Sequence, residues 1–292
     1  MIIDTFQVDS PLGCWTHSSW KPGAADPLAG LIDQIWHFDG ATSLPRERVF
    51  PNGLLEIIVH LDDRYWTLDE TGFTLSPTTC ITGLYSKAFV IEAPGRRCRV
   101  LGLRLKPAGA WALLRSPLSD LSERTVDLCD LIGREARELA ERCHDATTAT
   151  ERIRRTAEWA SARIQRSREI GDVNGAIAWA AACIANTDGA TPIARLREQT
   201  GLSSVRMAAA FREQVGMTPK RFARIHRLQR ALALLHSGSL PLAQIALDSG
   251  YYDQPHMNAE FREMTGLTPR EFLAAQHYPN SVSLAESAQH DM

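Results

Sequence analysis

An internal repeat constrains the fold of this 292-residue chain more than any other feature of its sequence. Residues 211–222 return 50 positions later as residues 261–272, with Phe-Arg-Glu, Gly-x-Thr-Pro and a closing Phe at the same spacing. A proline and a glycine upstream of each copy also recur, at an offset of 49. Self-similarity of this kind indicates that one small supersecondary unit is built twice.

Each copy predicts a short helix, a tight turn after a glycine, a second helix and a boundary before a third. Glycine supplies the positive φ that ends a helix, and Thr218 and Thr268 are good N-caps that precede a proline at the first helical position. Two short helices joined by a glycine-bearing turn are typical of helix-turn-helix units. A pair of plain helical hairpins, as in a solenoid, is the alternative. Two copies are too few for a solenoid, and a long helix over 219–237 separates them.

The charge of the repeated region agrees with a nucleic-acid partner. Residues 190–276 contain 11 basic and 7 acidic residues, and ten of the basic residues are arginine, whereas the whole chain has a net charge of −2. Arginine forks fit phosphates and base edges better than lysine does. An excess of four positive charges is mild, so it supports the repeat and does not identify nucleic acid by itself.

Helical phase divides the second helix of each unit into a buried and an exposed side. Met207 and Phe211 anchor the first helix, and Met257 and Phe261 anchor the second. A recognition helix reads bases with its N-terminal half, so the arginine late in each helix is expected to contact phosphate. The residues predicted to face DNA are Ser204, Val205, Arg206, Ala208, Ala209 and Arg212 in the first unit and Gln254, Pro255, His256, Asn258, Ala259 and Arg262 in the second. For the basic residues of the connecting helix, salt bridges and DNA contact both stay open.

These motifs resemble those of the AraC/XylS family of bacterial transcription regulators, over residues 172–276. The turn 201–203, Gly-Leu-Ser, resembles the first unit of that family, and Gly-Tyr-Tyr-Asp-Gln-x-His-x-Asn at 250–258 resembles its signature over the second unit. The resemblance implies two units rigidly joined by the helix over 219–237. It also implies that both recognition helices enter successive major grooves on one face of the DNA.

The chain departs from the family pattern on the predicted DNA face. The family often carries Gln-Arg where this chain has Ala208 and Ala209, and often Arg where it has Ala259. Alanine can touch a thymine methyl group but cannot form a hydrogen bond. Readout through DNA shape is therefore expected to add to the direct contacts. The polar readers that remain are Arg206, Gln254, His256 and Asn258.

The first 107 residues predict a β-rich domain, a sandwich or a small cupin-like barrel. Short apolar runs such as QIWHF, LLEIIVHL, FVIEA and RVLGLRL alternate with turn signals. The motifs at 31–38, 50–56 and 102–110 resemble an uncharacterised domain found ahead of such DNA-binding domains. Front domains in this superfamily are commonly ligand sensors or dimerisation units, and that role is an analogy here.

The remaining boundaries follow from composition and periodicity. Residues 108–170 predict a helical extension whose apolar stripe at 153, 157, 160 and 164 packs within the chain or pairs helices of a dimer. Residues 171–277 form the all-α double helix-turn-helix domain, and the polar residues 278–292 are expected to be a disordered tail. The fold class is therefore α+β, with a β-rich domain before an all-α domain.

Aromatic residues of the front domain predict an effector pocket, with an aromatic β core as the alternative. His37, Glu56 and His60 lack the tight His-x-His spacing of a metal site, so neither a metal nor another cofactor is predicted. The residues expected to line the pocket are Trp36, His37, Phe38, Phe50 and Trp66.

Together these features predict a cytoplasmic, sequence-specific transcription regulator that binds double-stranded promoter DNA and responds to a small-molecule effector. RNA polymerase and a second copy of the chain are further candidate partners, and activation and repression both stay open. No apolar run is long enough to cross a membrane, and the first residues lack the basic region of a secretory signal.

Two alternatives were weighed against this regulator. One is a DNA-targeted enzyme or repair protein that uses the helix-turn-helix module as an arm. Cysteine-based alkyl transfer would need a clustered, activated thiol, but the six cysteines are scattered, so no enzyme is predicted. The other is a dimeric regulator that binds no ligand.

Overall fold

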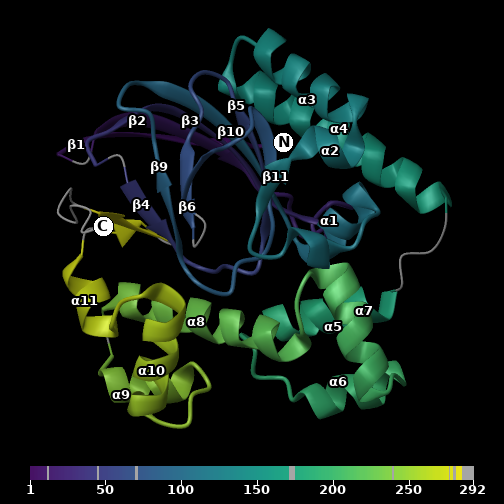
Figure 1. Ribbon diagram of the computed structural model, residues 1–292, viewed down its shortest axis with the longest axis vertical. Coiled ribbons are helices and arrows are strands. Elements are labelled where there is room, and N and C mark those ends of the chain that lie inside the picture. The colour runs from purple at the N-terminus through teal and green to yellow at the C-terminus, as the bar shows by residue number, and fades with distance from the viewer. Residues whose placement is uncertain are drawn as a thin grey trace.

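A computed structural model describes residues 1–284 except 12, 45, 70–71, 171–174, 239, 276 and 279–280. Figure 1 shows a β-rich half with helices against one side, and below it a half made of helices. The predicted fold class is therefore confirmed. No helix in the described part of the chain is long and apolar enough to span a membrane.

The larger sheet has seven antiparallel strands. Side chains alternate between its two faces, so Ile35, Leu103 and Ile57, which lie opposite one another, share one face, and all three are fully buried. In sheet order the strands are β1 (Asp4–Ser10), β2 (Gly13–Trp20), β3 (Ile32–Thr42), β10 (Cys98–Leu105), β5 (Leu55–His60), β8 (Thr79–Thr82) and β11 (Thr125–Asp127).

The smaller sheet combines strands from both ends of the chain. In sheet order they are β12 (His277–Tyr278), β13 (Ser281–Leu284), β4 (Arg46–Val49), β9 (Phe89–Glu92), β6 (Trp66–Asp69) and β7 (Gly72–Leu75). The expected disordered tail is wrong over β13, which pairs along the whole of β4. Pairing with a sheet edge uses the backbone, so it needs no apolar period in the sequence. Residues 285–292 lie outside the described part.

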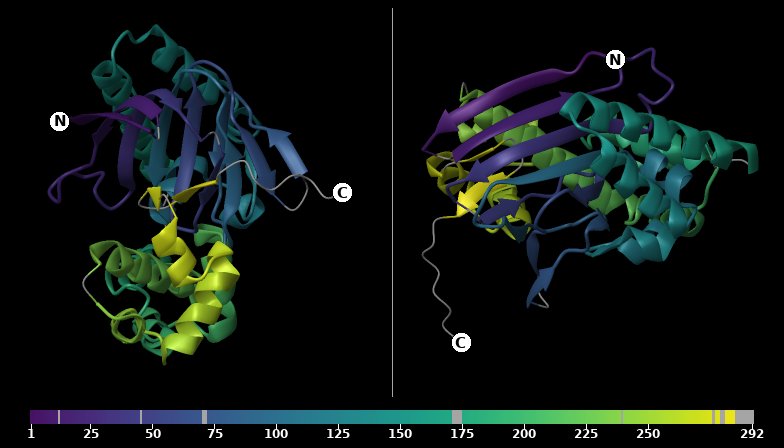
Figure 2. Two further views of the ribbon diagram at one scale, coloured as in Figure 1. Left: turned by 90° about the vertical axis from the view of Figure 1, so that its left-hand side faces the viewer. Right: turned by 90° about the horizontal axis from the view of Figure 1, so that it is seen from above.

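The helical extension packs on the larger sheet and is not purely helical. It contains α1 (Pro107–Leu114), a 3₁₀ turn (Leu118–Leu121), α2 (Leu128–Ile132), α3 (Arg134–Asp145) and α4 (Ala149–Ile170), and it also contributes β11. Helix α4 lies against β3, α1 and α3 (Figure 2). The apolar stripe predicted at Ile153, Ala157, Ala160 and Ile164 is at most 5% exposed. Of the two roles left open for it, the structure shows packing within the chain.

Seven helices make up the C-terminal half as described: α5 (Gly175–Asn186), α6 (Ile193–Thr200), α7 (Ser204–Val215), α8 (Pro219–Ser237), α9 (Leu242–Asp248), α10 (Gln254–Thr265) and α11 (Pro269–Ala274). The two repeats are α6–α7 and α9–α10, and the connecting helix α8 has the predicted bounds. Thr218 and Thr268 cap α8 and α11 with their side chains as expected. Gly216 and Gly266 end α7 and α10 in the left-handed conformation that favours glycine.

Candidate nucleic-acid interface

The first recognition helix, α7, is held by its apolar side and open on the other. Met207 and Phe211 are at most 1% exposed, and the Ser203 hydroxyl accepts a hydrogen bond from the Arg206 N–H at 3.3 Å. Val205, one turn from the cap, is 77% exposed. The predicted DNA face is therefore accessible: Ser204, Val205, Arg206, Ala209 and Arg212 are exposed, and Ala208 is half-buried.

The second recognition helix, α10, repeats this arrangement. Met257 and Phe261 are fully buried, and the Asp253 carboxylate accepts a hydrogen bond from the His256 N–H at 2.8 Å. The Oδ1 atom of Asn258 is buried and has no hydrogen-bond partner among the described residues. On the predicted DNA face, Pro255, His256, Ala259 and Arg262 are exposed, and Gln254 and Asn258 are half-buried.

The His256 side chain is engaged with the turn that precedes its own helix. Its Nδ1 atom accepts a hydrogen bond from the Tyr252 N–H at 3.4 Å, and its ring meets the Tyr251 ring edge-on at 5.4 Å. These contacts fix the shape of the turn. Base reading by His256 stays a prediction, and it competes with this local role.

Tyr252 is a surface feature that the sequence analysis did not single out. Its neighbour Tyr251 is buried, whereas Tyr252 is 86% exposed, directly before the cap of α10. A single exposed aromatic side chain is common on protein surfaces, so the position of Tyr252 beside the start of α10, and not its exposure alone, makes it a candidate DNA contact. The signal in the sequence is the Tyr-Tyr pair itself, because only one of two adjacent turn residues can enter the core.

Arg224 and Arg227, two of the α8 arginines whose role was left open, form ion pairs. Arg224 contacts Glu260 at 2.8 Å and Glu263 at 2.7 Å, and Arg227 contacts Glu260 at 3.4 Å. Arg227 also lies over the Tyr251 ring at 5.6 Å. Glu260 is on α10 and is only 7% exposed. These contacts hold the second recognition helix on α8.

The β-rich domain and the helical extension contact the two repeats at similar places, near the C-terminal end of α7 and of α10. The Ser122 hydroxyl donates a hydrogen bond to the carbonyl oxygen of Gly216, where α7 ends. The Ala88 N–H donates one to the carbonyl oxygen of Met264, at 2.7 Å, near the end of α10. Gly216 and Gly266 are partners in the sequence repeat, and a Cβ atom on Gly266 would lie 3.0 Å from the Arg48 guanidinium. The C-terminal ends of α7 and α10 are thus both packed on the N-terminal half of the molecule.

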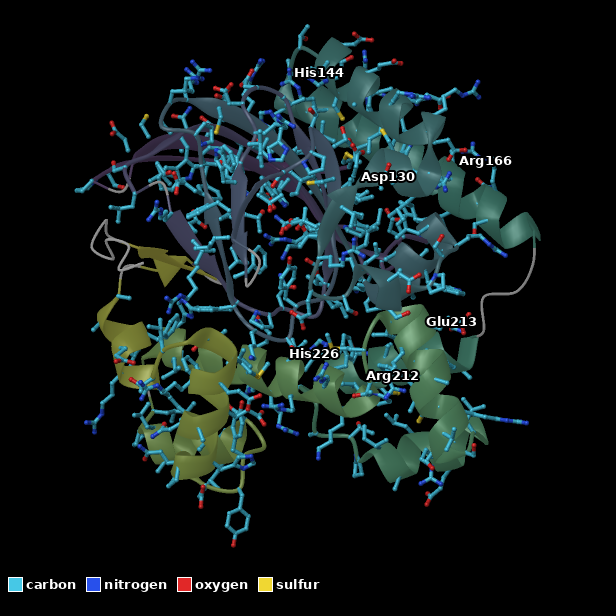
Figure 3. All side chains as sticks on the ribbon, viewed as in Figure 1. Asp130, His144, Arg166, Arg212, Glu213 and His226 are labelled. Carbon is cyan, nitrogen blue, oxygen red and sulfur yellow. The ribbon has the colours of Figure 1, made fainter. Side chains whose placement is uncertain are left out.

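The loop 51–53 rests on the middle of α8. The Gln229 side-chain amide donates a hydrogen bond to the Pro51 carbonyl oxygen at 2.6 Å. Gly53 has a φ of +76°, and a Cβ atom on it would lie 3.0 Å from the Nε2 atom of His226. Burial lowers the pKa of His226 to about 4. Figure 3 shows His226 on α8 beneath the β-rich half. This loop belongs to the Phe-Pro-Asn-Gly motif at 50–53 that carried the resemblance to the uncharacterised domain.

The five residues expected to line an effector pocket are not brought together. Trp36 and Phe38 face the inside of the domain, but strand alternation turns His37 to the opposite, helix-covered face, where it is 3% exposed. Phe50 packs edge-on against Phe272 of α11 at 5.9 Å, and Trp66 is 42% exposed on β6. The same alternation separates His37 from Glu56 and His60. Among the described residues, no group of His, Cys, Asp and Glu could hold a metal ion.

A different cluster lies on the inner face of the larger sheet. Glu56 accepts hydrogen bonds from the Trp36 indole at 2.6 Å and from the Arg104 guanidinium at 2.8 Å. The Trp36 ring lies over Gly102, where a Cβ atom would be only 2.2 Å from it, and His17 stacks on that ring at 6.1 Å. The Arg104 and Glu56 side chains are 28% and 22% exposed. This ion pair among aromatic rings therefore stays in contact with solvent.

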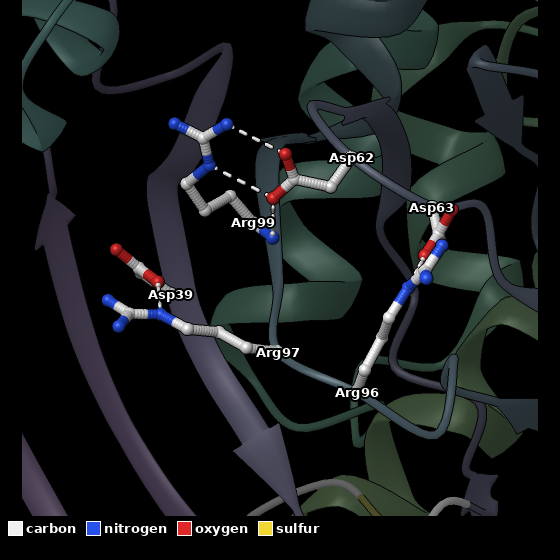
Figure 4. A pocket seen from close by; sticks show the side chains of 6 residues that line it. All are labelled: Asp39, Asp62, Asp63, Arg96, Arg97 and Arg99. Atoms are coloured by element: carbon white, nitrogen blue, oxygen red, sulfur yellow. Dashed lines mark hydrogen bonds and ion pairs between the residues drawn. The ribbon is translucent and has the colours of Figure 1, made fainter.

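A hollow of about 540 Å³ lies at the end of the larger sheet near the loop 94–97 (Figure 4). Each of its three arginines pairs with an aspartate: Arg97 with Asp39 at 2.7 Å, Arg99 with Asp62 at 2.7 Å, and Arg96 with Asp63. The charges of these three arginines are therefore balanced locally, so the hollow offers no net positive charge to an anionic ligand.

Comparison with known proteins gives two domain matches. Residues 196–275 match a family described as a helix-turn-helix domain, and residues 22–127 match a domain of unknown function, DUF6597. No curated protein matches the chain.

Several solved structures are also similar to this chain. ToxT from Vibrio cholerae, in its P21 crystal form, is 11% identical, with 93% of this chain and 98% of that chain covered and a TM-score of 0.45. Wild-type ToxT bound to an unsaturated fatty acid is 12% identical, with 81% and 93% covered and a TM-score of 0.44. A probable AraC family transcriptional regulator from Rhodopseudomonas palustris is 32% identical, with 34% of this chain and 95% of that chain covered and a TM-score of 0.31.

The helix-turn-helix match covers the repeated region, and the identity with the Rhodopseudomonas protein extends over nearly all of that relative. On these two findings, the chain belongs to the AraC family of DNA-binding transcription regulators.

Proposed function

We propose that this regulator recognises specific promoter sequences by placing α7 and α10 in two major grooves on one face of the DNA. The observation that carries the proposal is that both helices keep their predicted DNA faces accessible while their opposite sides are buried. The helix α8 joins the two units (Figure 1), and the ion pairs of Glu260 hold α10 on it. A rigid pair of readers favours two half-sites about one helical turn apart.

The side chains on these faces suit two kinds of contact. Arg212 and Arg262 lie late in their helices and are exposed, which suits phosphate contact. Arg206, Gln254 and Asn258 lie near the helix starts, where polar side chains reach base edges. The alanines and Val205 offer apolar contact to thymine methyl groups.

The experiment that tests this proposal is selection of genomic DNA fragments by the full-length protein at physiological salt. A shared motif with two half-sites is the expected result, and equal affinity for selected and random duplexes would overturn the proposal. Arg262→Ala should weaken binding to all sequences alike and reduce the salt dependence, whereas Asn258→Ala should relax the preference at one base pair. Arg137→Ala, on the exposed surface of α3, is the matched control and should leave binding unchanged.

We also propose that an effector binds on the inner face of the larger sheet, at Trp36, Glu56 and Arg104. An acceptor and a donor held side by side on an indole ring suit a neutral polar molecule that stacks on the ring and hydrogen-bonds to both groups. Calorimetric titration with a panel of neutral metabolites tests this, with Glu56→Gln as the variant that should abolish binding. If the panel produces no heat with either protein, the ligand-free regulator is favoured.

The position of Glu56 offers a route from this effector site to DNA. Glu56 is on β5, which follows directly after the loop 51–53 that contacts Gln229 on α8. A ligand that binds one position of β5 better than another shifts the population of loop positions, and with it the arrangement of the two reading units. At a promoter in the cytoplasm, the regulator would then contact RNA polymerase or block it.

A DNA-targeted enzyme is not supported by the thiols. Burial raises the pKa of Cys80 to about 12, and burial also raises the pKa of Cys98 and Cys143. A nucleophilic cysteine needs the opposite environment, one that stabilises the thiolate.

A further inference from the structure

Strand β1 is an end strand of the larger sheet, and no other strand of the described part pairs with its outer edge. Four strands end the two sheets as described, and β7, β11 and β12 have only four, three and two residues. Strand β1 has seven residues and pairs with β2 on one side only. Figure 2 shows it as the outermost strand of the sheet.

This edge lacks most of the features that prevent strands from pairing with another chain. Proteins protect long edges with charged side chains, lysine above all, and with proline, bulges or a covering element; the charged residues of β1 are Asp4 and Asp9, which lie toward its two ends. Strand β1 contains neither lysine nor proline, and its register with β2 is regular over all seven residues. It also carries Phe6, which is 54% exposed although it stacks on His17 at 5.0 Å. An edge with no charged residue at its centre and with an exposed aromatic ring is suited to a partner strand.

We propose that β1 pairs antiparallel with β1 of a second copy of this chain, about a two-fold axis at Gln7. A two-fold axis that keeps both copies on the same sheet face requires a residue to lie opposite itself. Gln7 is the middle residue of β1, so it gives the one such register in which all seven residues find a partner.

The side chains are complementary in this register. Phe6 lies opposite Val8, an apolar pair on one face of the joined sheets. On the strand ends, Asp4 lies opposite Ser10 and Asp9 lies opposite Thr5, so neither aspartate meets another acid. Like charges placed directly opposite would destabilise the pair. The two seven-stranded sheets would then form one continuous sheet across the dimer, and the buried stripe of α4 would take no part in it.

The test uses the residue on the axis, because it meets its own copy. Gln7→Glu and Gln7→Lys each place two like charges face to face, so each should raise the dissociation constant of the dimer about fivefold. An equimolar mixture of the two variants should form mixed dimers at least as stable as the wild-type dimer. Gln7 is exposed, so the fold of each monomer should persist, which circular dichroism checks.

Sedimentation of the full-length protein over a range of concentrations measures the dissociation constant. The same two substitutions at Thr74, an exposed residue on the edge strand β7, are the matched control and should have no effect. A protein that stays monomeric, a dimer unaffected by either Gln7 variant, or a mixture that dimerises no better than its parts would each overturn the proposal. The assay contains no DNA, so its outcome is independent of the proposed promoter recognition.

Discussion

His226 makes the contact between the front domain and α8 sensitive to acid. The residue is only partly buried, but its Nε2 atom is shielded from water and has no hydrogen-bond partner among the described residues. Its ring lies edge-on to Phe222 at 4.6 Å and close to Gly53 of the docked loop. Burial lowers the pKa of His226 from 6.5 to about 4, although Asp188 opposes the shift.

The sign of the effect follows from this lowered pKa. Protonation favours the state in which His226 is exposed, so docking keeps its full stability above about pH 6.5 and loses it as the pH falls toward 4. The difference between these two pKa values corresponds to at most about 3 kcal/mol. Because the residue is partly exposed, solvent screening reduces the loss to about 2 kcal/mol.

Amide hydrogen exchange of Asn52, Gly53 and α8 reports this docking directly. Between about pH 7 and about pH 5, wild type should lose roughly tenfold in protection after correction for the intrinsic rate, whereas His226→Gln should lose much less. The histidines at 17, 37 and 60 also have a pKa lowered by burial. They titrate in both proteins, so the difference between the proteins isolates His226. A pKa of 6 or higher for His226 by nuclear magnetic resonance would refute the reasoning.

Three further outcomes are expected. Glu260→Gln should lower the free energy of unfolding by about 2–3 kcal/mol in urea denaturation, because it leaves Arg224 with a buried neutral partner. A loss below about 0.5 kcal/mol would contradict the importance of this ion pair. Tyr252→Ala should weaken binding to the selected DNA about tenfold without changing the salt dependence, since it removes an aromatic contact and no charge. An altered salt dependence in binding titrations would argue against an aromatic contact between Tyr252 and DNA. Gly102→Ala should cost about 1–3 kcal/mol in thermal unfolding, because its Cβ would overlap the Trp36 ring, and a wild-type melting temperature would show that the ring moves aside.

The C-terminal half was predictable from the sequence because its signals are local. Glycine, threonine and proline mark the ends of α8, and a period of 3.6 residues separates the buried Phe211 and Phe261 from the DNA faces. The front domain was less accessible to this reasoning. Strand β1 is an exposed edge strand whose residues show little alternation of apolar and polar side chains. Strand β11 has only three residues, too few for any alternation to be recognised.

The effector site shows where sequence reasoning stops. Side chains along the strand QIWHF alternate between the two faces of the sheet, which puts His37 on the opposite face from Trp36 and Phe38. The sequence alone could therefore have excluded His37 from the predicted pocket. Phe50 was different, because its partner Phe272 is more than two hundred residues away and belongs to the other half of the molecule. The cluster of Glu56 and Arg104 depends on the register of β5 with β10, which no local pattern specifies.

The matching contacts at Gly216 and Met264 have a consequence for the operator. Since the N-terminal half of the molecule holds the ends of both α7 and α10, we expect that the two helices do not rotate independently to follow the DNA. One base pair inserted between the half-sites turns the second by about 35° around the duplex axis. Base substitutions within a half-site should therefore weaken binding far less than a change in the spacing between the two half-sites. A genome search for its promoters should keep that spacing constant and allow the sequence of each half-site to vary.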